Sequence, residues 1–263
     1  MSDPSQPLWL VLVGNLITQA IGYFTVVGLV FLIVWRVLRE RLRGARIPAP
    51  DRVNGAQIRR EVKHTFVTFI VGTTSVGAVI ALRGAGLTRI VEGDVPVLVT
   101  LAWIAGALAF NDLWFYSWHR FLHRPLPFRL IHAVHHKSVD VNPFTSYSFH
   151  AAEGFILGFW IVPAAVLLPI PMTALAVLQV VGLLNNVMSH LGYELLPRWL
   201  VRMPILRWTN TATFHSLHHT RLQGNFGLHS RIWDRLFGTE VAEYEAVFVR
   251  RGAGAPAPTP SPQ

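Results

Sequence analysis

The sequence predicts an all-α integral membrane protein with about four to five transmembrane or membrane-embedded helices and a cytoplasmic, histidine-rich helical cap. Three observations lead to this prediction. Of the 263 residues, 52% are hydrophobic and 14% are charged, whereas roughly 25% of the residues in a soluble domain are charged. The apolar residues form uncharged runs longer than a globular core helix requires. Most of the histidines gather in short motifs beside the ends of those runs.

The first predicted helix covers Leu8 to Trp35, a run of 28 residues without a charge. As a helix this run is about 42 Å long, which exceeds the ~30 Å hydrocarbon layer of a bilayer. A cleaved signal peptide has a basic start and a shorter apolar region, whereas this N-terminus carries Asp3 and no Lys or Arg. We therefore expect a retained transmembrane helix.

Further spans are predicted downstream. Thr65–Leu82 and Val95–Tyr116 are apolar and are separated by a short loop whose charges cancel, which predicts a hairpin across the membrane. Another apolar stretch covers Gly154–Ser189 and is interrupted by Pro163, Pro169 and Pro171. Because proline breaks helix hydrogen bonding and restrains the preceding residue, this stretch predicts two helices joined at a proline tip.

The net charge of +9 and the isoelectric point near 10.9 are compatible with nucleic acid or with an anionic membrane surface. The distribution favours the membrane and no nucleic-acid partner. The segments Arg36–Lys63, Arg120–Asp140 and Glu194–Arg251 hold 21 of the 23 basic residues. The positive-inside rule then places the N-terminus outside and the C-terminus in the cytoplasm. The same topology places every histidine motif on the cytoplasmic side, although no histidine was used to derive it.

Eight histidines occur in three motifs. The chain has no cysteine, so any metal binds through nitrogen or oxygen. Spacings of three and four residues return to one helical face, and each motif can therefore direct its imidazoles to one place. Eight ligands exceed the three or four that one catalytic ion uses, which favours two ions. Chemistry alone leaves zinc, copper, nickel and iron open. The motif residues are His119, His123, His132, His135, His136, His215, His218 and His219.

A structural role is the alternative interpretation of these histidines. It suits a lone residue such as His64, which fits the membrane interface. It does not suit the clusters, because neighbouring protonated imidazoles repel one another and buried ones need partners. We therefore interpret the three motifs as metal-binding.

The motifs HRFLH, HAVHH and HSLHH resemble, in order and spacing, the HxxxH, HxxHH and HxxHH boxes of the fatty acid hydroxylase and sterol desaturase superfamily. The segment Asn225–Thr239 (NFGLHSRIWDRLFGT) resembles the sequence that follows the last box. The likeness covers roughly residues 100 to 240. It implies an N-terminal transmembrane region at 1–95 and a catalytic domain at 96–240. The composition of residues 252–263 predicts a disordered tail.

The resemblance also implies a chemistry. Members of the superfamily hold two non-haem iron ions and use O2 and electrons to hydroxylate or desaturate a lipid, and sterols, fatty acyl chains and other lipids all remain open as substrates. We find no fingerprint of a built-in electron carrier, so we expect a separate electron-transfer protein of the ferredoxin or cytochrome b5 type with its reductase. By resemblance, His190 is a ninth metal ligand. His150 near Glu153 fits a helix-start or supporting role, and His229 a structural or substrate-lining role.

Asp112 is the one acid in the third apolar run, and an ionisable group at that depth marks a candidate functional site. It precedes His119 by seven residues and His123 by eleven, which places all three on one helical face. We expect its carboxylate to accept a hydrogen bond from a ligating imidazole and to lie nearer the metals than Glu153. The alternative is an acid at the water interface.

Two other function classes combine apolar helices with histidines. A membrane metal transporter usually places its ligands near the bilayer midplane, whereas these motifs fall at helix ends and in cytoplasmic segments. A non-catalytic metal-binding membrane protein is the second alternative. A membrane metalloprotease is disfavoured because the HExxH motif is absent from the sequence.

Overall fold

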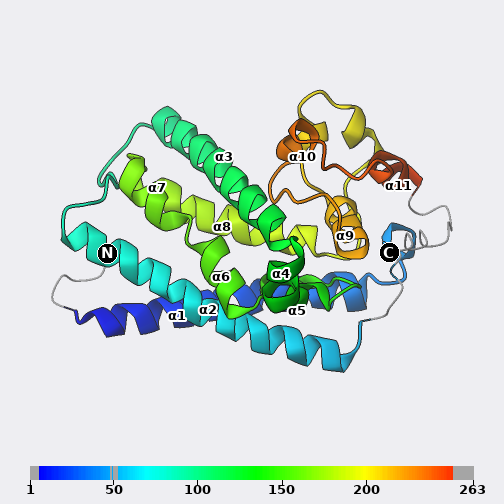
Figure 1. The fold of residues 1–263 in the computed structure, drawn as a ribbon, viewed down its shortest axis with the longest axis horizontal. Coiled ribbons are helices and arrows are strands. Elements are labelled where there is room, and N and C mark those ends of the chain that lie inside the picture. The colour runs from blue at the N-terminus through cyan, green and yellow to red at the C-terminus, as the bar shows by residue number, and fades with distance from the viewer. Residues whose placement is uncertain (1–5, 48, 50–52, 251–263) are drawn as a thin grey trace.

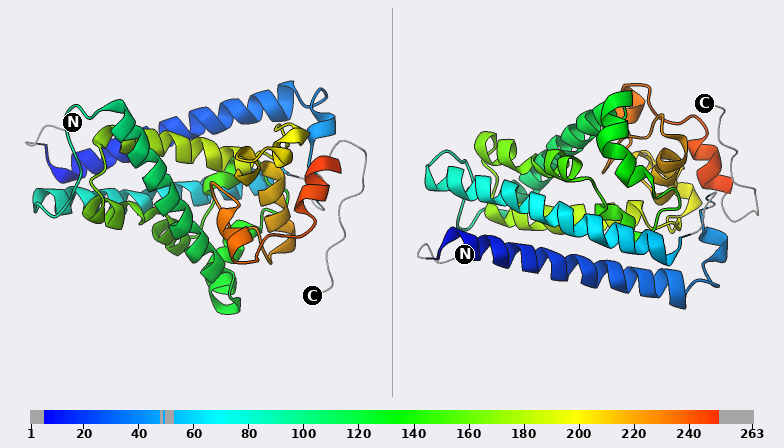
Figure 2. Two further views of the ribbon diagram at one scale, coloured as in Figure 1. Left: turned by 90° about the horizontal axis from the view of Figure 1, so that it is seen from above. Right: turned by 60° about the horizontal axis from the view of Figure 1, so that its bottom comes forward.

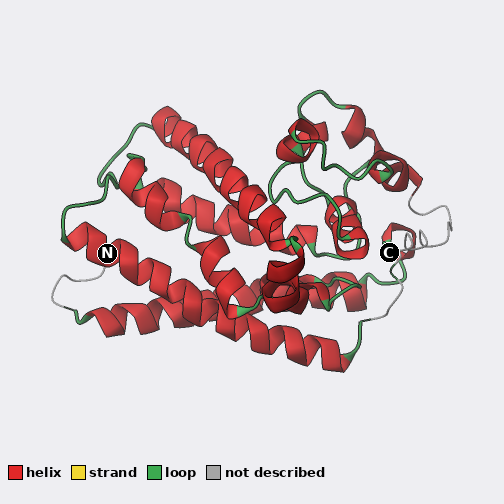
Figure 3. Cartoon of the chain, viewed as in Figure 1, coloured by secondary structure: helices red, strands yellow, loops and turns green. Residues whose placement is uncertain are grey.

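The computed structural model describes residues 6–47, 49 and 53–250 (Figure 1). Within these ranges the chain is mostly helical and contains no strand (Figure 3). The predicted all-α class is therefore confirmed. The tail predicted at 252–263 lies outside the described residues.

Four helices are long and apolar enough to cross a membrane. The first is α1 (Leu8–Val30), which continues as the π-helix η1 (Phe31–Val37), and the others are α2 (Gly55–Gly84), α3 (Val97–Leu122) and α8 (Met172–Ser189). Large apolar side chains along them face outward, and Leu98 on α3, for example, is 80% exposed. Such surfaces are stable in lipid and not in water. The chain is an integral membrane protein.

Two of these helices are longer than the apolar pattern predicts. α2 begins at Gly55, ten residues before Thr65, because the Asn54 side chain caps it by accepting from the backbone N–H of Gln57 at 2.9 Å. α3 continues to Leu122 and so includes His119 in its last turn. Hydropathy marks the part of a helix that lies in lipid, whereas caps mark the ends of the helix.

The stretch between α3 and α8 carries the second histidine motif and the membrane re-entry. It contains α4 (Pro125–Pro127), η3 (Phe128–His132), α5 (Ala133–His136), η4 (Pro143–Tyr147), α6 (Ala151–Gly158) and α7 (Ile161–Leu167). The chain turns at Phe159, the residue whose carbonyl the ring of Pro163 would meet in a continuous helix. α7 ends before Pro169 and α8 starts after Pro171, so the predicted proline tip is confirmed.

The C-terminal third forms a cap at one end of the helical bundle. Its helices are η5 (Arg198–Arg202), η6 (Leu206–Trp208), α9 (Ala212–Arg221), α10 (Ile232–Leu236) and α11 (Tyr244–Arg250). In Figures 1 and 2 the cap lies at the end opposite the N-terminus of α1. Phe214 and Leu217 of α9 pack there against Tyr244 and Phe248 of α11. The cap thus brings the third histidine motif over one end of α3 and one end of α8. These are the ends that the sequence predicts to face the cytoplasm.

Candidate metal centre

Nine histidines converge in two adjacent groups. Within each group the ring nitrogens that face inward lie within 4.8 Å of one another. These nine are the same residues that sequence and resemblance together predict as ligands. The five-histidine group contains His119, His123, His132, His136 and His218, and the four-histidine group contains His135, His190, His215 and His219.

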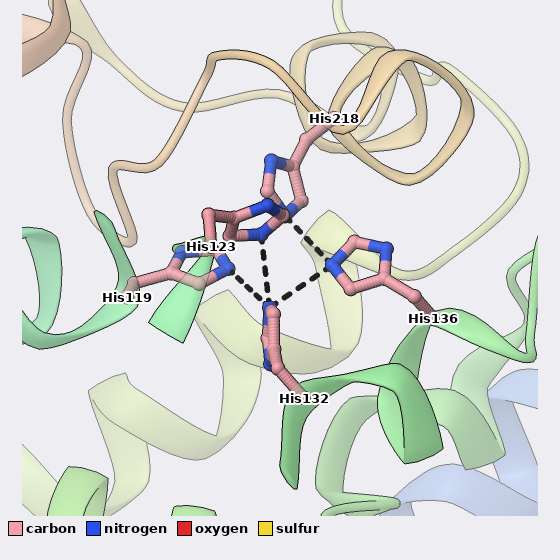
Figure 4. Close-up of side chains that lie close together, drawn as sticks. All are labelled: His119, His123, His132, His136 and His218. Carbon is pink, nitrogen blue, oxygen red and sulfur yellow. Dashed lines mark hydrogen bonds between the residues drawn. The ribbon is translucent and has the colours of Figure 1, made fainter. Parts of the chain in front are cut away.

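The five-histidine group gathers around His132 (Figure 4). The Nε2 atom of His132 lies 3.1 Å from Nε2 of His119, 3.0 Å from Nε2 of His123 and 3.0 Å from Nε2 of His136. His218 enters from α9, with its Nε2 3.1 Å from that of His136. Three separate elements therefore supply one group: the end of α3, the η3–α5 turn and α9.

The four-histidine group is centred on His215. Its Nε2 lies 2.9 Å from Nε2 of His190 and 3.1 Å from Nε2 of His219. The Nε2 atoms of His190 and His135 are 3.4 Å apart. His190 follows the last residue of α8 as its C-cap. The two groups adjoin, since the ring centroids of His136 and His219 are 4.6 Å apart.

Hydrogen bonds on the outer nitrogens fix the tautomer of several rings. The Nδ1–H groups of His119 and His218 donate to the carbonyls of Phe226 (2.8 Å) and Gly224 (2.7 Å). His132 donates from Nδ1 to Glu153 at 2.7 Å. A neutral imidazole has one N–H, so the inward Nε2 atoms of His119 and His132 face each other as lone pairs at 3.1 Å. Two lone pairs at this distance suit adjacent ligands of one metal ion, since metal–nitrogen bonds of about 2.0–2.1 Å place neighbouring ligand nitrogens about 3 Å apart.

Burial favours the neutral, metal-binding form of these rings. Burial lowers the pKa of His190 to about 4 and that of His123 to about 2. At neutral pH the rings are therefore uncharged, and each has one ring nitrogen with a free lone pair that a metal can bind. Burial, reinforced by neighbouring rings, also brings the pKa well below its usual value for His132, His135, His136, His215, His218 and His219.

The two acids occupy places opposite to those expected. Glu153, fully buried on α6, contacts the ring of His132 directly. Asp112 instead accepts from the backbone N–H groups of His229 (2.7 Å) and Leu228 (3.3 Å) and from the Ser230 hydroxyl (2.6 Å). Glu153, and not Asp112, contacts a metal-binding ring, so the expectation that Asp112 lies nearer the metals than Glu153 is wrong. Helical spacing gives the face of Asp112 but not the loop that folds onto that face.

The segment after the third motif supports the five-histidine group, and sequence reasoning missed how it is held. The buried carboxylate of Asp234 accepts from the backbone N–H groups of Phe226 (2.8 Å) and Gly227 (2.7 Å). A Cβ at Gly227 would lie 2.1 Å from the carbonyl oxygen of Ser230, so only glycine fits there. Asp234 thus positions the Phe226 carbonyl that orients His119.

Glu61 of α2 is a second residue that the sequence analysis missed. Its buried carboxylate accepts from Ser138 Oγ (2.7 Å), Asn142 Nδ2 (2.8 Å), Thr145 Oγ1 (2.8 Å) and Gln57 Nε2 (2.9 Å). These bonds tie the loop that follows the second motif to α2. The available signal was one acid among the basic residues at the start of an apolar run.

The two remaining histidines of interest lie outside both groups. The Nδ1 atom of His150 accepts from the backbone N–H of Ala152 at 3.2 Å, which confirms the helix-start role. The Nε2 atom of His229 lies 2.8 Å from the Asn111 side-chain oxygen. His229 therefore makes a structural contact with Asn111, and Asn111 in turn lines a pocket.

That pocket opens among the membrane helices next to the histidines. Its walls come from α1, α2, α3, α6, the start of α7 and α8, together with the 147–149 segment and Leu228. Phe115 in the wall contacts the ring of His119, with centroids 4.9 Å apart, and Phe149 contacts that of His135 at 4.8 Å. One phenylalanine therefore separates the pocket from one member of each histidine group.

Fold and site together define a membrane protein with a candidate dinuclear metal centre at the end of a helical bundle. Residues 104–239 match the fatty acid hydroxylase family. Because this segment is more than half of the chain, the chain belongs to that family, and the predicted membership is confirmed. No solved structure matches the chain.

Curated relatives fall in the same superfamily. The chain is 36% identical over 134 residues to a Delta(7)-sterol 5(6)-desaturase of Gibberella zeae, covering 50% of this chain and 36% of the relative. It is 34% identical over 146 residues to one of Aspergillus fumigatus, covering 54% and 38%. A very-long-chain aldehyde decarbonylase of Oryza sativa subsp. japonica is 30% identical over 161 residues, covering 58% and 25%. The match spans well under half the length of each relative.

Proposed function

We propose that this protein is a membrane-bound di-iron oxidoreductase that uses O2 to hydroxylate or desaturate a lipid, with its catalytic domain at 96–240 and an N-terminal transmembrane region at 1–95. The observation that carries this proposal is the placement of two histidine groups at the end of an uncharged pocket within the helical bundle. Family membership and the names of the relatives support it.

The chain's own residues have three tasks in this proposal. The nine imidazoles hold the two ions, and Glu153 and the Phe226 carbonyl orient two of the rings. Phe115 and Phe149 separate the rings from the pocket and shape the place where a carbon atom approaches. When bound, a pair of irons supplies the O2 activation that removal of hydrogen from an unactivated C–H bond requires.

A lipid is the proposed substrate because the pocket lies between helices that cross the membrane. The transporter alternative receives no support from the ligand positions. His119 occupies the last turn of α3, and the other ligands follow α3 and α8 or lie in the cap. Ligands at helix ends suit a reaction at the membrane boundary better than passage through the midplane.

Metal content tests the di-iron assignment. We expect carefully purified protein to contain about two irons per chain, since nine ligands divide into groups of five and four. Elemental analysis together with a turnover assay measures this. A single zinc that persists after iron-replete expression, with activity intact, would contradict the assignment.

We further propose that the histidine groups and the C-terminus face the cytoplasm, where a separate ferredoxin or cytochrome b5 type protein delivers electrons. The positive-inside pattern supports this orientation. The chain has no cysteine, so single introduced thiols report topology directly. Lys137 and Leu87 are both exposed, on opposite sides in this arrangement. In intact cells an impermeant thiol reagent should label Leu87→Cys and leave Lys137→Cys unmodified; the reverse pattern would show the opposite orientation.

A further inference from the structure

The end of the pocket away from the histidines carries polar side chains that have no role in the proposed reaction. The metal end of the pocket includes Thr68, whose hydroxyl donates to the carbonyl of Tyr147 at 2.9 Å, and Asn186, whose carbonyl accepts from His190. Seven residues further into the membrane on the same two helices, the wall carries Ser75 on α2 and Gln179 on α8. Seven residues of helix rise by about 10 Å. The pocket is therefore about that long, with polar side chains at both ends.

Ser75 differs from every other hydroxyl side chain on α2. Thr65, Thr68, Thr73 and Thr74 each donate to a carbonyl of the preceding turn. Ser75 is 2% exposed and lines the pocket, yet its Oγ has no hydrogen-bond partner in the described chain. A buried hydroxyl without a partner is unfavourable, so its presence at a pocket wall indicates a ligand that completes it.

The chemistry of the lining restricts that ligand. None of the residues that line the pocket is Asp, Glu, Lys, Arg or His, and a charged group at this depth would need a counter-charge. Gln179 brings an amide to the same end, and Gln19 of α1 adds a second amide to the pocket wall. An amide and a hydroxyl offer both donors and acceptors, which a neutral hydroxyl group can satisfy.

Resting on the proposed function, we propose that the substrate is a neutral lipid with a hydroxyl group that binds Ser75, about 10 Å from the metal end. This class of substrate excludes free fatty acids and lipids with charged headgroups. A long-chain alcohol and a sterol share this chemistry and differ in shape. Gly72 and Gly182 line the space between the two ends, and a Cβ at either position would meet nothing within 4 Å. The glycines thus leave room for the lipid body.

Equilibrium binding to the purified full-length chain tests this proposal without electrons or turnover. The probes are radiolabelled hexadecan-1-ol against hexadecane, cholesterol against cholestane, and palmitate. We expect at least one alcohol to bind more tightly than its hydrocarbon and than palmitate. Ser75→Ala should weaken binding of that alcohol by about 3- to 10-fold, the loss of one net hydrogen bond, and leave hydrocarbon binding unchanged. Which alcohol responds distinguishes a flexible chain from a sterol.

Thr74→Ala is the matched control, because the exposed hydroxyl of Thr74 bonds only to its own helix. This variant should leave the affinity for the alcohol and the affinity for the hydrocarbon unchanged. Gly182→Leu should weaken binding of alcohol and hydrocarbon together by filling the pocket, whereas the lipid-facing Gly106→Leu should not. Equal alcohol affinity in wild type and Ser75→Ala, or an alcohol that binds no more tightly than its hydrocarbon or palmitate, would overturn the proposal. Binding is measured without turnover, so the result tests the hydroxyl-binding proposal even if the metal centre is shown not to be a di-iron site.

Discussion

The two histidine groups differ in what holds their rings. In the five-histidine group, the outer nitrogens of His119, His132 and His218 donate to oxygen atoms of other elements, namely Phe226, Glu153 and Gly224. In the four-histidine group, His190 donates to the carbonyl of Asn186 one turn earlier in the same chain segment, and His135 donates to the carbonyl of Ser148 over a longer distance, 3.3 Å. The Nδ1 atoms of its His215 and His219 have no partner among the described residues, whereas in the five-histidine group this holds only for His136.

This difference indicates that the two ions depend on different parts of the chain. The five-histidine group relies on a carboxylate and on the 224–230 segment, which Asp234 and Asp112 hold from the outside. Such outer partners orient a ring and raise its basicity as a ligand. The four-histidine group relies mainly on the positions of α5, α8 and α9, and its one bond to another segment is the longer contact from His135 to Ser148 at 3.3 Å. Substitutions remote from the ligands should therefore affect the ion in the five-histidine group more than the ion in the four-histidine group.

Removal of one ligand from each group should give the largest effect. We expect His119→Ala to lower iron from about two to about one per chain by emptying the five-histidine group, and His219→Ala to do the same for the four-histidine group. Turnover should fall by roughly 100-fold or more in both, since a dinuclear reaction needs both ions. Elemental analysis and product formation measure these outcomes.

His150→Ala serves as the control for that pair, because His150 caps α6 outside both groups. It should retain two irons. If either ligand variant kept two irons and full turnover, that histidine would not be a ligand. If each variant lost all iron, the two groups would bind their ions as one cooperative unit.

Glu153→Gln should give the next largest effect and should be selective. The amide oxygen of glutamine can still accept from His132 Nδ1–H at 2.7 Å, but it is a weaker acceptor than a carboxylate. Loss of such a partner typically costs about 10- to 100-fold in metal affinity or activity. The selectivity can be measured in the single-ligand backgrounds. Glu153→Gln should remove the remaining iron from His219→Ala and leave the remaining iron in His119→Ala.

Equal iron loss in both backgrounds would show that Glu153 supports the whole bundle rather than the ring of His132. Ser146→Ala is a suitable comparison, because Ser146 is as buried as Glu153 but bonds to Pro143 and Tyr23 away from the rings. It should leave the iron content unchanged in either background.

Much of this architecture can be predicted from the sequence, since lipid and metal impose local patterns. Apolar runs of membrane length identify the four spans, and spacings of three and four identify the box histidines. His190 required the family resemblance, because a lone histidine after an apolar helix has no distinctive pattern. The division into groups of five and four was not predictable, since neighbouring His135 and His136 point to different groups.

The supporting residues could not be assigned for a related reason. Glu61 and Glu153 act on segments distant in sequence, Glu61 on Ser138 and Glu153 on His132. Asp234 acts on a nearby loop, at Phe226 and Gly227, that follows no helical period. Periodicity describes one helix at a time, so it correctly gave the face of Asp112 but not its partner. Such contacts depend on how loops pack, which tertiary structure decides.

Asp112→Asn should give the smallest effect, in contrast to Glu153→Gln. One amide oxygen can still accept from the His229 N–H, whereas the Ser230 hydroxyl loses its anionic acceptor at 2.6 Å. Weakening such a bond costs about 1–3 kcal/mol locally, and in the described chain the Asp112 carboxylate bonds to the 228–230 segment and to no metal-binding ring. We therefore expect both irons to remain and turnover to fall only several-fold, with faster amide exchange in residues 224–230. Ser230→Ala removes the same bond from the other side, so the double variant should be no worse than Asp112→Asn alone. Loss of one iron in Asp112→Asn as complete as in Glu153→Gln would mean that the 224–230 segment, and not the Glu153 carboxylate, controls the five-histidine group.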